Sequence, residues 1–304
     1  MKITKIYKPP SARLKKLVAE KRGWRMTSAF KRLREDYSLQ SKKFPIFSVA
    51  DGVTLAIKPG KTYPVPSGAG EVAKIFCRSA INDSERTYAD FQAKNILDIF
   101  TQSNTEARNY NSKRGRTEKT INYFDIDYFC ATAAFALVRK SELFWGAIGD
   151  ARVVLKDRNG KIRFSSHDRV APIEKLTARK IKHPKPQEKK YFQQKYFRNK
   201  IGAKGELVGY GVINGEEEAL CYVEYGKAKI QKGDQLFIFS DGFAPYFRLP
   251  NFRKLFLEWP SGLEKKISDF TQAHVSGRLP RNAEKQYRFL YKYASERSLF
   301  AIKF

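Results

Sequence analysis

Two stretches of the sequence place a carboxylate where an apolar run ends. Asp51 follows the run 44–50, Asp241 follows the run 235–240, and each is followed by a glycine. A carboxylate at the exit of a buried strand is held rigidly, and a following glycine allows close approach to the backbone. Asp-Gly is also a common turn sequence, so either site alone has a simpler interpretation. Two such strand ends, about 190 residues apart in sequence, make chemical sense if they meet around one ligand.

An acidic pair, Glu35 and Asp36, precedes the first expected strand. The 15 positions from Asp36 to Asp51 suit a hairpin whose outer ends lie side by side. Carboxylates packed together repel one another unless cations lie between them. Oxygen-only ligands of this kind are typical of Mg²⁺ or Mn²⁺ sites. The acidic segments therefore predict a divalent-cation site.

The elements that would position these acids follow from hydrophobic periodicity and turn residues. Strands are expected at 37–40, 44–50, 128–138, 143–148, 152–156, 161–165, 219–223, 228–230, 235–240 and 299–304. Helices are expected at 72–80, 85–109, 172–197, 252–257, 263–273 and 283–293. The short links within 128–165 predict an antiparallel meander. Because strands and helices are segregated rather than alternating, the order predicts an α+β layered sandwich.

Bulk properties exclude several classes of protein. A hydrophobic share of 42% and an aromatic share of 14% exclude global disorder, and no apolar run approaches the roughly 20 residues that span a bilayer. Cys77, Cys130 and Cys221 are widely spaced in apolar segments, which predicts buried, reduced thiols in a cytoplasmic protein. The three histidines show no ligand spacing, and no P-loop or dinucleotide-binding motif is present.

The charge is unusual, with a net value of +28 over 304 residues. Residues 174–204 carry 11 lysines and arginines against 2 acidic residues, and residues 1–50 carry 14 against 3. Such clusters are most often solvated helix faces. A nucleic-acid partner is compatible with the charge but is not favoured, because no nucleic-acid-binding motif accompanies it. We expect residues 1–25 to form a basic N-terminal extension and residues 26–304 to form the main folded domain.

The order of short motifs resembles the metal-dependent, type 2C serine/threonine protein phosphatases. The resemblance runs from residue 34 to the C-terminus, and its most specific part is the stretch 143–155, which resembles the family's Gly-Asp-Ser-Arg motif and its flanking strands. The other matching stretches are 34–36, 47–52, 67–73, 130–138 and 232–242. Within the most specific stretch, Asp150 and Arg152 have an alternative interpretation as an ion pair that ties a turn.

The resemblance implies a four-layer α-β-β-α sandwich, two antiparallel sheets flanked by helix pairs, with two Mn²⁺ or Mg²⁺ ions. It implies that Asp51 bridges the metals and that Asp241 binds the second one. The first metal would be bound by the Gly52 carbonyl and by Glu35 or Asp36. The phosphate-binding position of the family falls on a basic pair, Lys31 and Arg32. The implied reaction is hydrolysis of phosphoserine or phosphothreonine in a phosphoprotein, without a membrane partner.

Two positions depart from the family's pattern. Val53 replaces the family's His or Met after Asp-Gly, and Ser295 takes the place of the aspartate before the last strand. The next residue, Glu296, is therefore the predicted metal ligand at that end of the site. The alternative is a catalytically impaired pseudo-phosphatase that binds phosphoproteins or regulates a partner.

Overall fold

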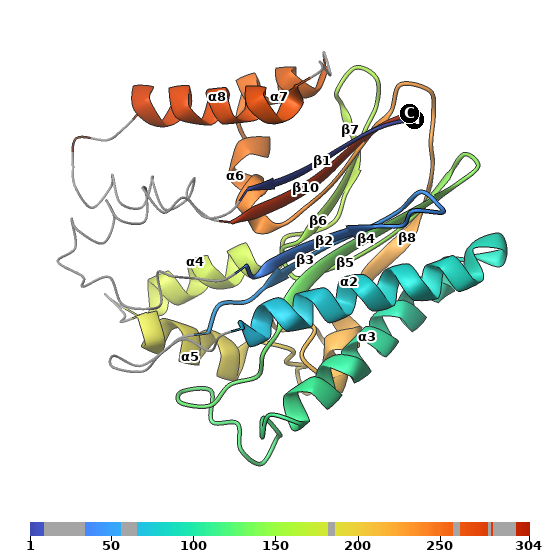
Figure 1. Cartoon of the computed structure of the whole chain (residues 1–304). Coiled ribbons are helices and arrows are strands. Elements are labelled where there is room, and N and C mark those ends of the chain that lie inside the picture. The colour runs from blue at the N-terminus through green and yellow to red at the C-terminus, as the bar shows by residue number, and fades with distance from the viewer. Residues whose placement is uncertain (9–33, 56–65, 182–185, 258–261, 279–280, 282–295) are drawn as a thin grey trace.

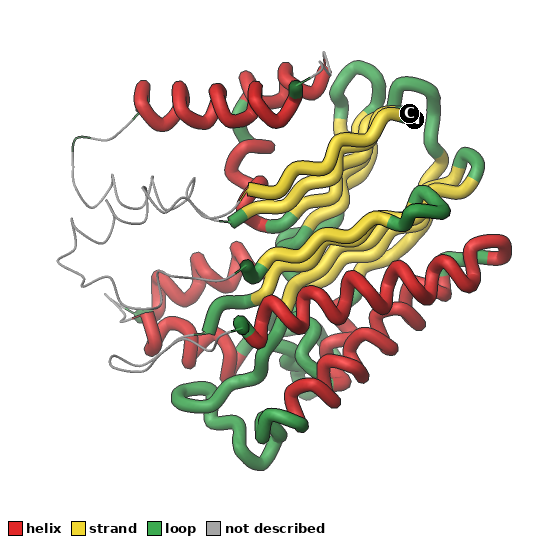
Figure 2. Tube along the Cα trace, in the orientation of Figure 1, coloured by secondary structure: helices red, strands yellow, loops and turns green. Residues whose placement is uncertain are grey.

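Two five-stranded antiparallel sheets face each other in the computed structural model, and helices cover their outer faces (Figure 1). The structure describes residues 1–8, 34–55, 66–181, 186–257, 262–278, 281 and 296–304. This arrangement confirms the expected α+β class and the four-layer sandwich. The tube view shows the two sheets as parallel layers with helices above and below (Figure 2).

The first sheet has the order β1-β10-β9-β6-β7. Its strands are β1 (Lys2–Lys8), β6 (Arg152–Lys156), β7 (Ile162–Ser165), β9 (Gln235–Phe239) and β10 (Arg297–Lys303). The second sheet has the order β2-β3-β4-β5-β8. Its strands are β2 (Asp36–Gln40), β3 (Ile46–Gly52), β4 (Ala131–Arg139), β5 (Glu142–Ile148) and β8 (Glu224–Lys229).

Three buried clusters follow from the alternation of side chains along these strands. Phe47, Val49 and Ile238 belong to the cluster between the two sheets. The cluster outside the second sheet packs against α2 (Gly68–Thr87) and α3 (Lys94–Ser112). The cluster outside the first sheet packs against three helices, which are α6 (Ala244–Phe247), α7 (Pro250–Leu257) and α8 (Leu263–Gly277).

Two further helices, α4 (Val170–Lys180) and α5 (Pro186–Tyr196), lie beside the end of the sandwich where β2 begins and β3 ends (Figure 1). They pack on each other and together match the expected basic helical segment 172–197. Three short 3₁₀ helices complete the described elements. They are η2 (Tyr88–Asp90), η3 (Glu217–Tyr222) and η4 (Asp241–Phe243).

The expected meander over 128–165 is wrong at its middle link. β4 pairs with β5 and β6 pairs with β7, but Gly149 and Asp150 carry the chain from the second sheet to the first. A short link between two strands of alternating pattern is equally compatible with two strands that pair in one sheet and with a chain that passes from one sheet to the other. The pattern of hydrophobic residues therefore could not separate the two cases.

Residues 219–223 are also not a strand, because this segment lies within η3. Ala219 and Tyr222 are buried three positions apart, which is the period of a 3₁₀ helix. Cys221 is exposed on this turn, which corrects the expectation that all three thiols are buried. The expected helix 283–293 lies outside the described residues.

The N-terminal residues 2–8 form β1 and pair with β10 rather than forming an extension. The basic residues concealed this strand, yet lysines are common on edge strands, where they discourage pairing with other chains. Residues 9–25 of the expected extension lie outside the described residues. None of the described helices is long and apolar enough to span a membrane.

Candidate functional site

The hairpin of β2 and β3 places Asp36 directly opposite Asp51. Asp51 shares its strand face with Phe47 and Val49, which pack between the two sheets. The two carboxyl groups therefore lie at the end of the inter-sheet core, where they are hydrogen-bond neighbours.

The third acid reaches this point from the other sheet. Asp241 begins η4 directly after β9, and its carboxyl group is a hydrogen-bond neighbour of Asp51. The preceding residue, Ser240, is fully buried and donates from Oγ to Oδ2 of Asp36 at 2.6 Å. The same Oγ accepts from the backbone N–H of Ser298 in β10 at 2.9 Å. The Ser240 hydroxyl, at the end of β9, thus contacts both β2 and β10 and fixes the orientation of the Asp36 carboxylate.

Asp150 is the fourth acid of this group, and the candidate residues from the acidic segments did not include it. Its negative charge acts on Asp51, and that of Asp241 acts on Asp150. The alternative ion pair with Arg152 does not form among the described residues, since Arg152 donates to Ser165 instead. The available signal was an aspartate next to a glycine at the end of an apolar strand, although the order of the two residues is reversed relative to the other two sites. We refer to Asp36, Asp51, Asp150 and Asp241 as the aspartate cluster.

Burial and mutual repulsion shift the protonation of this cluster. Burial, reinforced by the charge of Glu296, raises the pKa of Asp36 to about 8. Burial raises the pKa of Asp51 well above its usual value, and the charges of Asp36 and Asp241 add to this. Burial also raises the pKa of Asp150. Full ionisation near neutral pH therefore needs an added positive charge.

The chemistry of these donors fits a divalent cation. All four groups are carboxylates, which Mg²⁺ and Mn²⁺ prefer, and two pairs of them are already within hydrogen-bond reach of each other. In the part of the chain that the structure describes, no three acidic, histidine or cysteine side chains form a completed ligand set around one point. A bound ion would therefore require small side-chain adjustments and water as additional ligands.

Gly52 has a structural role at this corner. A Cβ at this position would lie 2.6 Å from the backbone carbon of Ala69, at the start of α2. Only glycine lets β3 and α2 approach so closely. Its predicted use as a carbonyl ligand stays a prediction.

The two members of the first acidic pair point to different places. Asp36 joins the cluster, whereas Glu35 accepts hydrogen bonds from Ser67 Oγ and Thr54 Oγ1, each at 2.8 Å. Ser67 is the N-cap of α2, so Glu35 holds the start of that helix against β2. Of the two alternative ligands, the geometry favours Asp36.

Glu296 lies close to the cluster, but its carboxylate oxygens are engaged. Oε1 accepts from Tyr7 Oη at 2.6 Å and Oε2 accepts from the backbone N–H of Glu35 at 2.9 Å. These contacts fasten the start of β2 to β1 and β10. Each oxygen keeps a lone pair, so metal binding by Glu296 would be compatible with both contacts. The predicted phosphate contacts Lys31 and Arg32, and Ser295, lie outside the described residues.

We expect the stability of the metal-free protein to depend on pH through this cluster. A carboxyl whose pKa is raised on folding contributes stability at acid pH, which is lost as the pH rises toward the folded value. For Asp36 that loss ends near pH 8. The melting temperature of the metal-free protein should therefore fall between about pH 6 and about pH 8.5, and less in Asp36→Asn.

Added Mn²⁺ should reverse this fall, because an ion that binds only the folded state stabilises it. The rise in melting temperature should be several degrees and larger at the higher pH, and it should shrink in Asp36→Asn. Differential scanning fluorimetry at both pH values measures all of these quantities. Equal pH slopes for the two proteins, with no effect of Mn²⁺, would contradict the description of the cluster as a cation site.

Comparisons with known proteins agree with this geometry. A family model described as protein phosphatase 2C matches residues 31–277. A search of curated proteins found no match. Among solved structures, a serine/threonine phosphatase of S. agalactiae superposes with a TM-score of 0.54 at 13% identity, covering 100% of this chain and 99% of that one.

Two further solved structures show the same fold. The Mycobacterium tuberculosis serine/threonine phosphatase PstP/Ppp gives a TM-score of 0.55 at 11% identity, covering 99% of this chain and 97% of the other. Serine/threonine phosphatase Stp1 from Staphylococcus aureus gives 0.53 at 11% identity, covering 100% and 95%. At these identities the structures establish the shared fold, and the family model establishes the relationship.

Proposed function

Because the chain belongs to the protein phosphatase 2C family, we propose that it hydrolyses phosphoserine and phosphothreonine in proteins with two Mn²⁺ or Mg²⁺ ions. One observation carries the proposal beyond family membership. Carboxylates from both sheets and from distant parts of the sequence converge at one end of the sandwich, where burial and mutual repulsion raise their pKa values. Such an arrangement lowers the free energy of unfolding unless cations are bound to the carboxylates.

Some of these residues would bind the ions, and others orient the ion-binding side chains. Asp36, Asp51 and Asp241 would hold the two ions, with Asp51 shared between them. Bound cations of this kind lower the pKa of a coordinated water and stabilise negative charge on a phosphoryl group. Ser240 orients the Asp36 carboxylate by donating to Oδ2. Lys31 and Arg32 remain the proposed contacts to the phosphate of the substrate.

The test is hydrolysis by the full chain after removal of metal with a chelator. p-Nitrophenyl phosphate and a phosphothreonine peptide serve as substrates, and phosphate release is followed with and without Mn²⁺ or Mg²⁺. We expect turnover only with an added ion and saturation as the ion concentration rises. Absence of ion-dependent turnover on both substrates would overturn the hydrolase proposal.

A second candidate is phosphoprotein binding without turnover, and the residue at the family's last aspartate position favours it. Ser295 has no carboxylate, and the neighbouring Glu296 carboxylate already accepts hydrogen bonds from Tyr7 and from the backbone N–H of Glu35. One ion would then be held weakly. Fluorescence anisotropy with a labelled phosphothreonine peptide distinguishes the two, since binding without phosphate release supports the second candidate.

The proposed compartment is the cytoplasm. All three cysteines are free, and Cys77 and Cys130 are buried. Free thiols are typical of a reducing environment, where signalling by protein phosphorylation also operates.

A further inference from the structure

A second cavity lies away from the aspartate cluster, between the segment that follows α3 and the segment that precedes η3. Its volume is about 760 Å³, which is within the range of small-molecule sites. No member of the aspartate cluster is among its lining residues. The lining residues that matter here are Arg116, Glu118, Tyr123, Tyr128, Lys200 and Glu216.

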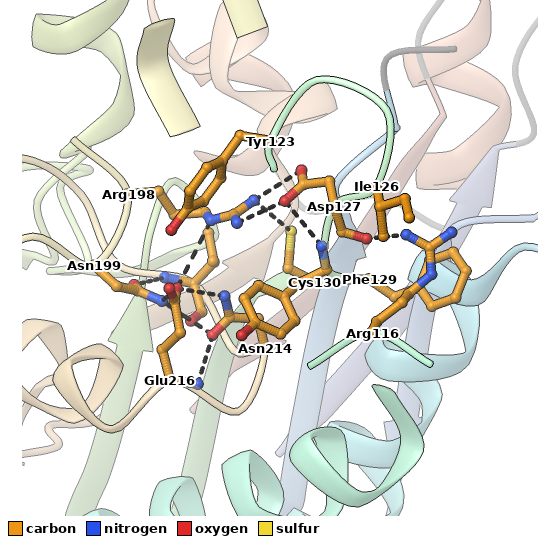
Figure 3. A network of polar contacts seen from close by, with 12 residues as sticks. Arg116, Tyr123, Ile126, Asp127, Phe129, Cys130, Arg198, Asn199, Asn214 and Glu216 are labelled. Carbon is orange, nitrogen blue, oxygen red and sulfur yellow. Dashed lines mark hydrogen bonds and ion pairs between the residues drawn. The ribbon is translucent and has the colours of Figure 1, made fainter. Parts of the chain in front are cut away.

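A buried ion pair lies next to three of the lining residues, Tyr123, Asn199 and Glu216 (Figure 3). The guanidinium of Arg198, 1% exposed, donates to both oxygens of Asp127 at 2.7 and 3.0 Å. Nε of Arg198 makes no hydrogen bond and lies 3.9 Å from Oε2 of Glu216. Arg198 is thus paired with two carboxylates, those of Asp127 and Glu216, and this group of three side chains keeps a net charge of −1.

The contacts of Glu216 leave one oxygen available. Oε2 accepts from Nδ2 of Asn199 at 2.9 Å and from Nδ2 of Asn214 at 2.6 Å (Figure 3). Oε1 has no partner among the described residues. Amide donors orient a carboxylate without cancelling its charge. A partly buried carboxylate in this state favours a cation supplied from outside.

The other charges of the lining balance one another, with three basic residues (Arg108, Arg116 and Lys200) against three glutamates (Glu118, Glu217 and Glu218). The guanidinium of Arg108 donates hydrogen bonds to the backbone carbonyl of Gly215 at 2.7 Å and to Oε1 of Glu217 at 3.2 Å. Arg116 donates to the backbone carbonyl of Asp127 and lies 3.9 Å from the ring centre of Phe129.

Glu118 and Glu218, in contrast, form no ion pair within the described part of the chain. Lys200 is the remaining base of the lining, and its Nζ is 3.5 Å from Tyr123 Oη. With Glu216 included, the lining carries four glutamates against three basic residues, a net charge of −1 in a protein of net charge +28.

Two tyrosine rings add faces that attract cations. The guanidinium of Arg198 already lies 5.4 Å from the ring centre of Tyr123 and 5.8 Å from that of Tyr128. Tyr123 has a positive φ of 60°, an uncommon conformation for an aromatic residue that the surrounding contacts must maintain. Burial, together with the nearby charge of Glu216, raises the pKa of Tyr128 to about 12, so its hydroxyl stays neutral.

We propose that this cavity binds a small organic cation carrying ammonium groups, with Oε1 of Glu216 as its central acceptor. Glu118 and Glu218 attract the ligand at the rim, and the rings of Tyr123 and Tyr128 contact its charged end. The proposal is independent of catalysis at the aspartate cluster.

Spermidine titration by isothermal calorimetry at low salt tests the proposal. The titration uses the full chain as Asp51→Asn with saturating Mg²⁺, so that the aspartate cluster does not compete for the polyamine. The net charge of +28 suppresses non-specific binding of a polycation, which makes a positive result informative. We expect one spermidine per chain, and about tenfold or greater weakening by Glu216→Gln in the same background.

The double variant Glu118→Gln and Glu218→Gln keeps the test valid if Glu216→Gln disturbs folding, because both side chains are exposed. It should weaken binding several-fold, with a reduced dependence on salt. Asp90→Asn combined with Asp98→Asn, an equal charge change at two exposed positions outside the lining, is the matched control and should bind as the parent does. No spermidine binding by the parent, or equal affinity in the double variant and the control, would overturn the proposal.

Discussion

Asp51→Asn should reduce Mn²⁺-dependent hydrolysis of p-nitrophenyl phosphate by about a thousandfold or more, since metal-site interactions supply several kcal/mol of transition-state stabilisation. Asparagine has the same shape but removes the charge placed between Asp36 and Asp241. The loss should appear in kcat, and additional Mn²⁺ should not restore it. Stopped assays over a range of ion concentrations measure both effects.

The same substitution should leave the metal-free fold intact or more stable. The charges that act most strongly on Asp51 are those of other acids, so removing its own charge relieves repulsion. A melting temperature equal to or above that of the parent, together with lost activity, separates a functional effect from unfolding. Asp98→Asn, which changes charge on an exposed helix face, should retain full activity. Retained activity in Asp51→Asn would contradict the bridging role.

Arg198→Met should lower the free energy of unfolding by about 3–5 kcal/mol. The substitution leaves Asp127 buried without its two guanidinium hydrogen bonds. Asp127 also accepts from the backbone N–H of Tyr128, so it cannot easily turn toward solvent. Urea unfolding followed by tryptophan fluorescence gives the change in midpoint and slope.

Asp127→Asn combined with Arg198→Met should recover part of this loss, because no unpaired charge then remains buried. The cycle of the two single variants and the double variant isolates the coupling between the side chains. Additive losses would show that the ion pair contributes no specific stabilisation. The aspartate cluster lies elsewhere, so Mn²⁺-dependent activity of the folded fraction should be unchanged.

Local sequence was sufficient to predict the contact at the centre of the site. Asp36 and Asp51 belong to one hairpin, whose length and alternating pattern determine which residues face each other. The helices on the outer sheet face were predictable for the same reason, since their apolar periodicity is a local property. The order of the motifs was sufficient to identify the family, because the order and spacing of motifs are properties of the sequence alone.

Local sequence was insufficient wherever a contact joins distant segments. The bond from Ser240 to Asp36 spans 204 positions, and that from Glu35 to Glu296 spans 261. No periodicity indicates which polar side chain completes such a bond. The same limitation concealed Asp150, because the pattern around it does not show that the chain changes sheets there. It also concealed the pairing of Arg198 with Asp127, where a basic segment looks like a solvated helix face.

The sequence by itself was therefore sufficient to identify Asp51 and Asp241 as candidate site residues and to predict the class of the fold and the family. Only the tertiary structure decided which acids share one buried space, how that space raises their pKa values, and that the oxygens of Glu296 are engaged at the start of β2. The physical reason is that strand faces and hairpin registers are set by neighbours along the chain. The packing of one sheet against the other is set by side-chain contacts between residues hundreds of positions apart.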